Sequence, residues 1–210
     1  MSARFFVFAD GVDVDLLEGI DDESRRLSAV QALNKIARDA RAQAATRIMQ
    51  QVALPESYVQ PGGHRLYVSK QATKRSLEAR ITARGRATSL ARFVEGNPSL
   101  HAEGLNVKVH PGKSVFLRRA FLIRLPGVGG STDPGLGNTA LAVRVGPGGT
   151  LRNKSFARKV ASGLYVLYGP SVAQVFRDNQ DEGVANDLAP EIVEKLTVEF
   201  SRLVDYKLRK

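Results

Sequence analysis

The chain of 210 residues contains no cysteine and only three histidines. The absence of cysteine excludes disulfide bonds, thiolate zinc sites and a cysteine nucleophile. His64, His101 and His110 lack the spacing of metal ligands on one helical face, and they lie among predicted turns and strand ends. We therefore expect no metal site and no redox chemistry at sulfur.

Long apolar runs are missing as well. The longest ones, Phe5 to Ala9 and Leu164 to Tyr168, fall far short of the roughly 18 residues that a membrane span needs. Arg4 precedes only a short apolar stretch before acidic residues begin, which is unlike the basic-then-apolar layout of a secretory signal. The sequence thus predicts no membrane contact through a spanning segment and no export signal.

Acidic residues are scarce in the middle of the chain. The formal net charge is +10, with 31 Lys and Arg against 21 Asp and Glu. Residues 62–159 hold 18 of the basic and 4 of the acidic residues, whereas both flanking regions are slightly acidic. A basic centre of this kind favours either a polyanion or an acidic protein surface as partner, although a solvated sheet face explains the same pattern.

The candidate interaction residues are basic side chains of this central region. They are grouped in two stretches of sequence and together suffice for several contacts with phosphates or carboxylates. The candidates are Arg80, Arg84, Arg86, Arg92, Lys108, Lys113, Arg118 and Arg119.

The N-terminal third predicts an extended segment followed by a long helix. Residues 1–22 are interpreted as a strand or an arm, because apolar and acidic residues alternate over Val12–Leu16. Asp21 and Asp22 offer an N-cap for a helix in which apolar residues recur at three-to-four spacing from Leu27 onward, and Pro55 limits its end. Its apolar stripe is narrowed to alanine in the middle, which lets another backbone approach closely.

Residues 23–210 are predicted to form a single α+β domain. Short runs with period-two alternation predict a central, mostly antiparallel sheet, and a final amphipathic helix is expected to start at Asp187 as its cap. Residues 114–125 fit either a strand or a short helix. The Gly/Pro-rich run 126–139 is expected to be a loop, and it lacks the pattern and the lysine of a phosphate cradle, so no cofactor is expected.

The stretch LYVLYGPSVAQVF, residues 164–176, raises the possibility of a serine nucleophile. A nucleophile elbow requires G-x-S-x-G and a histidine later in the chain, but all three histidines precede Ser171. Pro170 also removes an amide donor beside that serine. We therefore interpret Gly169, Pro170 and Ser171 as a structural turn in which Ser171 caps a helix, and we expect a protein that is not an enzyme.

Five segments, in this order, resemble the minor tail protein Z family of long-tailed bacteriophages. The resemblance runs from about residue 28 to residue 176. The segments are ALNKIARDARAQAATRI, ARITARGRATSLARF, KSVFLRRAFL, AVRVGPGG and LYGPSVAQVF.

The resemblance implies a tail completion or terminator-like protein at the head-proximal end of the tail, needed for head-tail joining. It implies kinship with the α+β ring proteins of the head-tail connector and tail terminator, and hence a homo-oligomeric ring of six copies. The tail tube protein and connector proteins would be its partners. Assembly in the host cytoplasm and residence in the virion tail follow from the same resemblance.

A DNA-binding protein is the alternative from another functional class. The basic region 62–159 would grip the genome end through phosphates, without reading sequence, because no recognition helix or aromatic platform is evident. Its signature would be binding that weakens steeply with salt, since each neutralised phosphate releases counterions.

Overall fold

The computed structural model describes residues 3–8, 22–100, 102–125, 139–146, 149–151, 154–177 and 183–209. It confirms the α+β class, since two long helices pack together and all strand pairings among the described residues are antiparallel. The elements are, in chain order, β1 (Ala3–Phe8), α1 (Asp22–Gln51), α2 (Glu56–Val59), η2 (Pro61–Gly63), β2 (Leu66–Lys70), β3 (Glu78–Ala83), β4 (Thr88–Ser89), η3 (Leu90–Phe93), β5 (Leu105–His110), β6 (Lys113–Leu117), β7 (Ala120–Arg124), β8 (Thr139–Arg144), β9 (Ala157–Ala161), β10 (Leu164–Gly169), α3 (Val172–Phe176) and α4 (Val184–Leu208).

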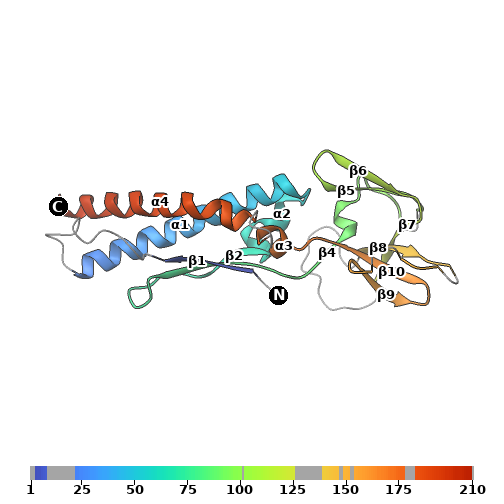
Figure 1. Cartoon of the computed structure of the whole chain (residues 1–210), viewed down its shortest axis with the longest axis horizontal. Coiled ribbons are helices and arrows are strands. Elements are labelled where there is room, and N and C mark those ends of the chain that lie inside the picture. Colours follow the sequence, from blue (N-terminus) through green and yellow to red (C-terminus); the bar gives the residue numbers. More distant parts are fainter. Residues whose placement is uncertain are drawn as a thin grey trace.

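Figure 1 shows an elongated molecule with two ends of different composition. The helical half contains the four α-helices and the sheet β1-β3-β2, and the β lobe consists of residues 88–169. We expected one central sheet, but the described strands form three sheets, because the chain leaves β3 through the irregular residues 84–87 and pairs anew beyond them. The β lobe contains the sheet β4-β10-β8-β7, with β9 paired to β10, and the separate hairpin β5-β6.

The long N-terminal helix forms as the spacing of apolar residues predicts. α1 ends at Gln51, four residues before Pro55, and packs against α4 (Figure 1). Its buried side is rich in alanine, and three of these alanines are completely buried: Ala32, Ala37 and Ala44. Small side chains at these positions leave room for a neighbouring backbone, which is how a helix with little apolar volume still takes part in the main core.

The C-terminal helix begins earlier than expected. α4 starts at Val184 with Gly183 as its N-cap, so the prediction of Asp187 as cap was wrong. Burial is the physical reason, because Val184 is fully buried and adds an apolar residue to the helix before Asp187. Pro190 therefore lies inside the helix, where it cannot donate to the carbonyl four residues earlier.

A buried carboxylate joins the two long helices. Glu199 of α4 is 8% exposed and accepts hydrogen bonds from Arg202 Nη2 at 2.7 Å and from Lys35 Nζ of α1 at 2.7 Å. These bonds, that from Arg202 first, lower the pKa of Glu199 from 4.5 to about 2 against the opposing effect of burial. The depressed pKa means that the folded state prefers the ionised carboxylate more than the unfolded chain does.

We expect Glu199→Gln to lower the free energy of unfolding at neutral pH by about 1–2 kcal/mol, because both cationic partners are largely exposed and solvent-screened. The contribution of Glu199 is complete above pH 4.5 and is lost as pH falls toward 2. The difference between wild type and variant in urea unfolding should therefore shrink over that window. A difference that stays constant from neutral pH to pH 2 would contradict this assignment.

The three-stranded sheet places β3 between its two neighbours. Ala79, Ile81 and Ala83 of β3 are buried, as the alternation predicts, and β3 packs on α1. On the opposite side of the strand, Arg80 Nη2 lies 3.0 Å from a carboxylate oxygen of Glu78.

The segment 114–125, for which strand and helix were both open, is extended. It forms most of β6 and then β7, which are separated by a turn at Arg118 and Arg119. Thr139 begins β8, and the rest of the predicted Gly/Pro-rich loop, residues 126–138, lies outside the described residues.

One hydrophobic core runs through both parts of the molecule. It includes Leu33 and Ile48 of α1 as well as Val107 and Leu141 of the β lobe. The junction is tied by a hydrogen bond from Ala53 N to Val109 O (2.8 Å), and the Arg92 guanidinium lies 4.5 Å from the centroid of the buried Tyr58 ring. The β lobe is thus held against the C-terminal end of α1.

Ser171 caps a helix, as predicted. Its Oγ accepts a hydrogen bond from Gln174 N (3.1 Å), and Gln174 Oε1 accepts one from Ser171 N (2.8 Å), which completes a capping box. Ser171 is 2% exposed. A Cβ at Gly169 would lie 2.8 Å from the Phe93 ring, so glycine permits the close packing just before this turn.

Candidate interaction surface on the β lobe

Several strands of the β lobe are edge strands, and two of them, β6 and β9, stand out. Within the described residues, β6 pairs with β5 and β9 pairs with β10, and neither has a second neighbour. Figure 1 shows them on opposite sides of the lobe. Each strand carries or adjoins large apolar side chains with substantial exposure, namely Val115 (48%), Phe116 (60%), Phe156 (46%) and Val160 (41%). Unpaired edges with exposed apolar groups are places where another chain can add.

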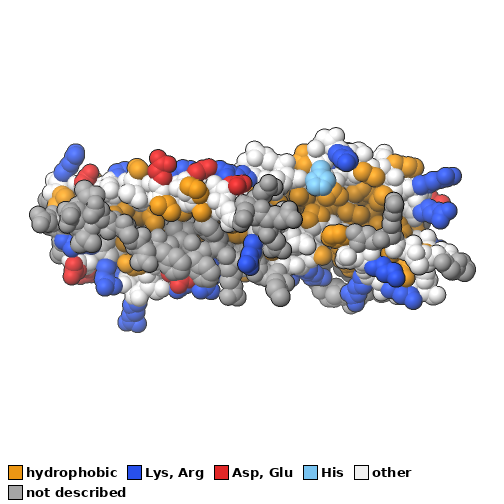
Figure 2. All heavy atoms as spheres, viewed as in Figure 1, with side chains coloured by type: hydrophobic (Ala, Val, Ile, Leu, Met, Phe, Trp, Pro, Cys, Tyr) orange, Lys and Arg blue, Asp and Glu red, His pale blue; other side chains and the backbone are white. Residues whose placement is uncertain are grey.

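The β lobe also concentrates the positive charge of the protein. Residues 88–169 contain eleven Lys and Arg against three Asp and Glu, which leaves them with +8 of the total charge of +10. In the view of Figure 2, basic side chains surround the outer end of the lobe beside an apolar area over β5 and β6. The exposed cations include Lys113, Arg118, Arg119, Arg124, Arg144, Lys154, Arg158 and Lys159.

The structure distributes the predicted interaction residues over both parts of the molecule. Arg80 lies on β3 in an ion pair with Glu78, and Arg84 and Arg86 lie between β3 and β4. Arg92 packs on Tyr58 at the junction, as described above.

The other predicted residues belong to the β lobe. Lys108 is half-buried on β5, while Lys113 on β6 and the turn residues Arg118 and Arg119 are exposed. Together with Arg86, which is exposed between β3 and β4, these last three are the exposed members of the predicted set.

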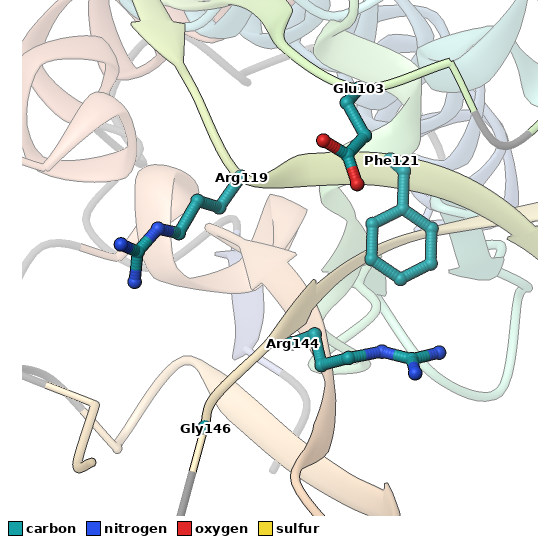
Figure 3. Close-up of a pocket in the computed structure, with 5 residues that line it drawn as sticks. All are labelled: Glu103, Arg119, Phe121, Arg144 and Gly146. Carbon is teal, nitrogen blue, oxygen red and sulfur yellow. The ribbon is translucent and has the colours of Figure 1, made fainter.

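An open pocket of about 560 Å³ lies at one end of the β7-β8 ladder. Its lining residues are Glu103, Arg119, Phe121, Arg144 and Gly146. Figure 3 shows Arg144 extending beneath the Phe121 ring, the Glu103 carboxylate beside that ring, and the Arg119 side chain directed away from it. Among the described residues, neither arginine of the pocket has a hydrogen-bond or ion-pair partner.

Strand register explains why the two arginines of the pocket lie together. Ala120 pairs with Val143 in the antiparallel β7-β8 ladder, so Arg119 and Arg144 flank the same end of it. Their side chains diverge from there, with Arg144 running beneath the Phe121 ring and Arg119 directed away from it (Figure 3), so an elongated partner with more than one negative group could meet both. Sequence reasoning missed Phe121, Arg144 and Glu103. Only the pairing of β7 with β8 brings Arg144 to Arg119, and Glu103 is placed by its neighbour Gly104, which donates to Ala120 O (3.0 Å).

The structure places the candidate serine in a structural role. Ser171 is buried and its hydroxyl accepts a backbone amide, so it is not placed as a nucleophile. No group of three or more potential metal ligands occurs in the described part of the chain.

Among the helices of the described residues, none combines the length and the apolar composition required to cross a bilayer. Cations, edge strands and apolar side chains are the exposed features that stand out on the described part of the β lobe.

Comparison with protein-family models, with curated proteins and with solved structures gives no match.

Proposed function

We propose that the chain is a structural component of a bacteriophage tail, a completion or terminator-like protein at the head-proximal end that is needed for head-tail joining. The observation that carries this proposal is the ordered set of five segments that resembles the minor tail protein Z family. The α+β fold is compatible with it. The edge strands and the basic, partly apolar β lobe are features that suit a protein built to contact other subunits.

In this proposal the protein forms a homo-oligomeric ring, of six copies because the tubes of long-tailed phages are usually sixfold. It contacts the tail tube protein on one side and connector proteins on the other. It assembles in the host cytoplasm and stays in the virion. Rings arise from head-to-tail contacts between two different surfaces of the same chain, and the β lobe and the helical half are two such surfaces.

The test is assembly of tails with and without the protein. Without it, we expect tails of normal length that fail to join heads, and added purified protein should restore joining. Labelled protein should be seen as a ring at one end of the tube. Joined and infectious particles formed in its absence, or tails that never contain the labelled protein, would overturn the proposal.

A sequence-independent DNA-binding protein is the second candidate, and the +8 charge of the β lobe favours it. The exposed Arg118 and Arg119 are better test positions than Arg80, whose charge is already paired. Arg118→Glu with Arg119→Glu should weaken DNA binding and reduce its salt dependence, whereas Arg38→Glu on the helical half should change little. Binding that is insensitive to salt would exclude this function.

A further inference from the structure

The segment 9–21 is acidic and contains no basic residue. Its five acids, in thirteen residues, alternate in part with apolar residues over Val12-Asp13-Val14-Asp15-Leu16. Such a segment is complementary to the β lobe, which is basic and carries exposed apolar side chains. The question is whether it can reach the β lobe of its own chain.

Figure 1 shows the start of α1 at the end of the helical half farthest from the β lobe, and the end of β1 part-way along α1. Phe8 pairs with Glu78 at the end of β3 that leads back to the β2-β3 turn. Arg26, in the first turns of α1, donates to Lys74 O of that same turn (3.2 Å). The opposite end of α1 is the one that meets the β lobe, through the hydrogen bond from Ala53 to Val109.

Chain length excludes a contact within one chain. α1 has 30 residues and is therefore about 45 Å long. A loop of thirteen residues contains about 45 Å of chain at full extension. Because it must leave Phe8 and return to Asp22, which lies farther from the β lobe, it can extend at most about 23 Å beyond Phe8 toward that lobe. The segment cannot reach the pocket beyond the far end of α1 in its own chain, but it can reach that pocket in a second copy.

We propose that the acidic segment of one copy docks on the pocket formed by Arg119, Phe121 and Arg144 in the β lobe of the next copy. The carboxylates of Asp13 and Asp15 pair with the two guanidinium groups, neither of which has a partner among the described residues. Apolar residues of the segment contact Phe121. Glu103 also lines the pocket, and its carboxylate repels any further acidic residue of the segment that would lie beside it.

The contact joins two different surfaces, so it is heterologous and generates a ring or a filament rather than a closed dimer. It supplies the subunit contact of the ring proposed above. Its test, however, needs only the purified chain, so it can succeed while the tail assignment fails, and the reverse is also possible.

The experiment is a charge swap measured by sedimentation velocity on the full chain at low ionic strength. The first variant carries Asp13→Arg and Asp15→Arg, and the second carries Arg119→Glu and Arg144→Glu. Wild type should self-associate, and each variant alone should associate at least about tenfold more weakly, because like charges then face each other. An equimolar mixture of the two variants should associate again, since each segment then finds a lobe of opposite charge. The chain with all four substitutions should do the same, which also shows that the substitutions leave the fold intact.

Wild type that stays monomeric at low ionic strength would overturn the proposal. So would unchanged association in either variant, or failure of the mixture and of the fourfold variant to associate. If the Arg119 and Arg144 variant loses DNA binding but keeps its association, the pocket serves a nucleic acid and not a second copy. Asp39→Arg, at an exposed position of α1, is the matched control and should leave association unchanged.

Discussion

Truncation of Phe176 to alanine is expected to lower the free energy of unfolding by about 3–5 kcal/mol. Phe176 is 2% exposed and ends α3, which packs against α1, α4 and β3. Removing the ring leaves a cavity where these elements meet, and the surrounding helices cannot close it without disturbing their own packing. The loss is a large part of the roughly 5–15 kcal/mol by which a domain is usually stable.

Phe116 offers a matched control, because it is the same residue type at 60% exposure. Phe116→Ala should change the free energy of unfolding by less than about 0.5 kcal/mol. Urea unfolding followed by far-UV circular dichroism compares the two variants directly. Equal effects of the two substitutions would show that α3 does not take part in the cooperative core.

Elements with a strong local pattern were predictable from the sequence. The spacing of apolar residues indicated α1, and alternation indicated which side of β3 is buried, because both patterns reflect contact with a single apolar core. The capping role of Ser171 followed from the residues on either side of it. In each of these cases, the information lies within a few residues of the element itself.

Features that depend on distant pairing were not predictable. The pocket requires Arg119 and Arg144 to flank one end of the β7-β8 ladder, and nothing near either residue encodes that register. Arg80 looked like a free cation until the structure placed it against Glu78, its neighbour two positions earlier on the same strand side. The division into three sheets has the same cause, because strand pairing is a long-range choice.

Gly163→Ala is expected to destabilise the protein by about 2–4 kcal/mol and to weaken association between copies. Gly163 has a φ of +66°, in the left-handed region, where a side chain is unfavourable. An added Cβ would also lie 2.6 Å from Val145 O, and this backbone oxygen cannot move aside like a side chain. Gly163 O accepts a hydrogen bond from Val145 N (2.7 Å), so the adjoining ends of β8 and β10 must shift together.

Two other glycines separate the steric effect from the conformational one. Gly112 has a φ of +78° but open space around an added Cβ, so Gly112→Ala should cost only the strain of about 1–2 kcal/mol. Gly62→Ala, which has neither feature, should be nearly neutral.

Val145 lies between Arg144 and Gly146 of the pocket, so a shift of its backbone displaces the Arg144 side chain. At temperatures where both variants are folded, association between copies should therefore be weaker for Gly163→Ala than for wild type. Gly112→Ala should associate like wild type. If both variants associate equally well, the pocket is not the surface that receives the acidic segment.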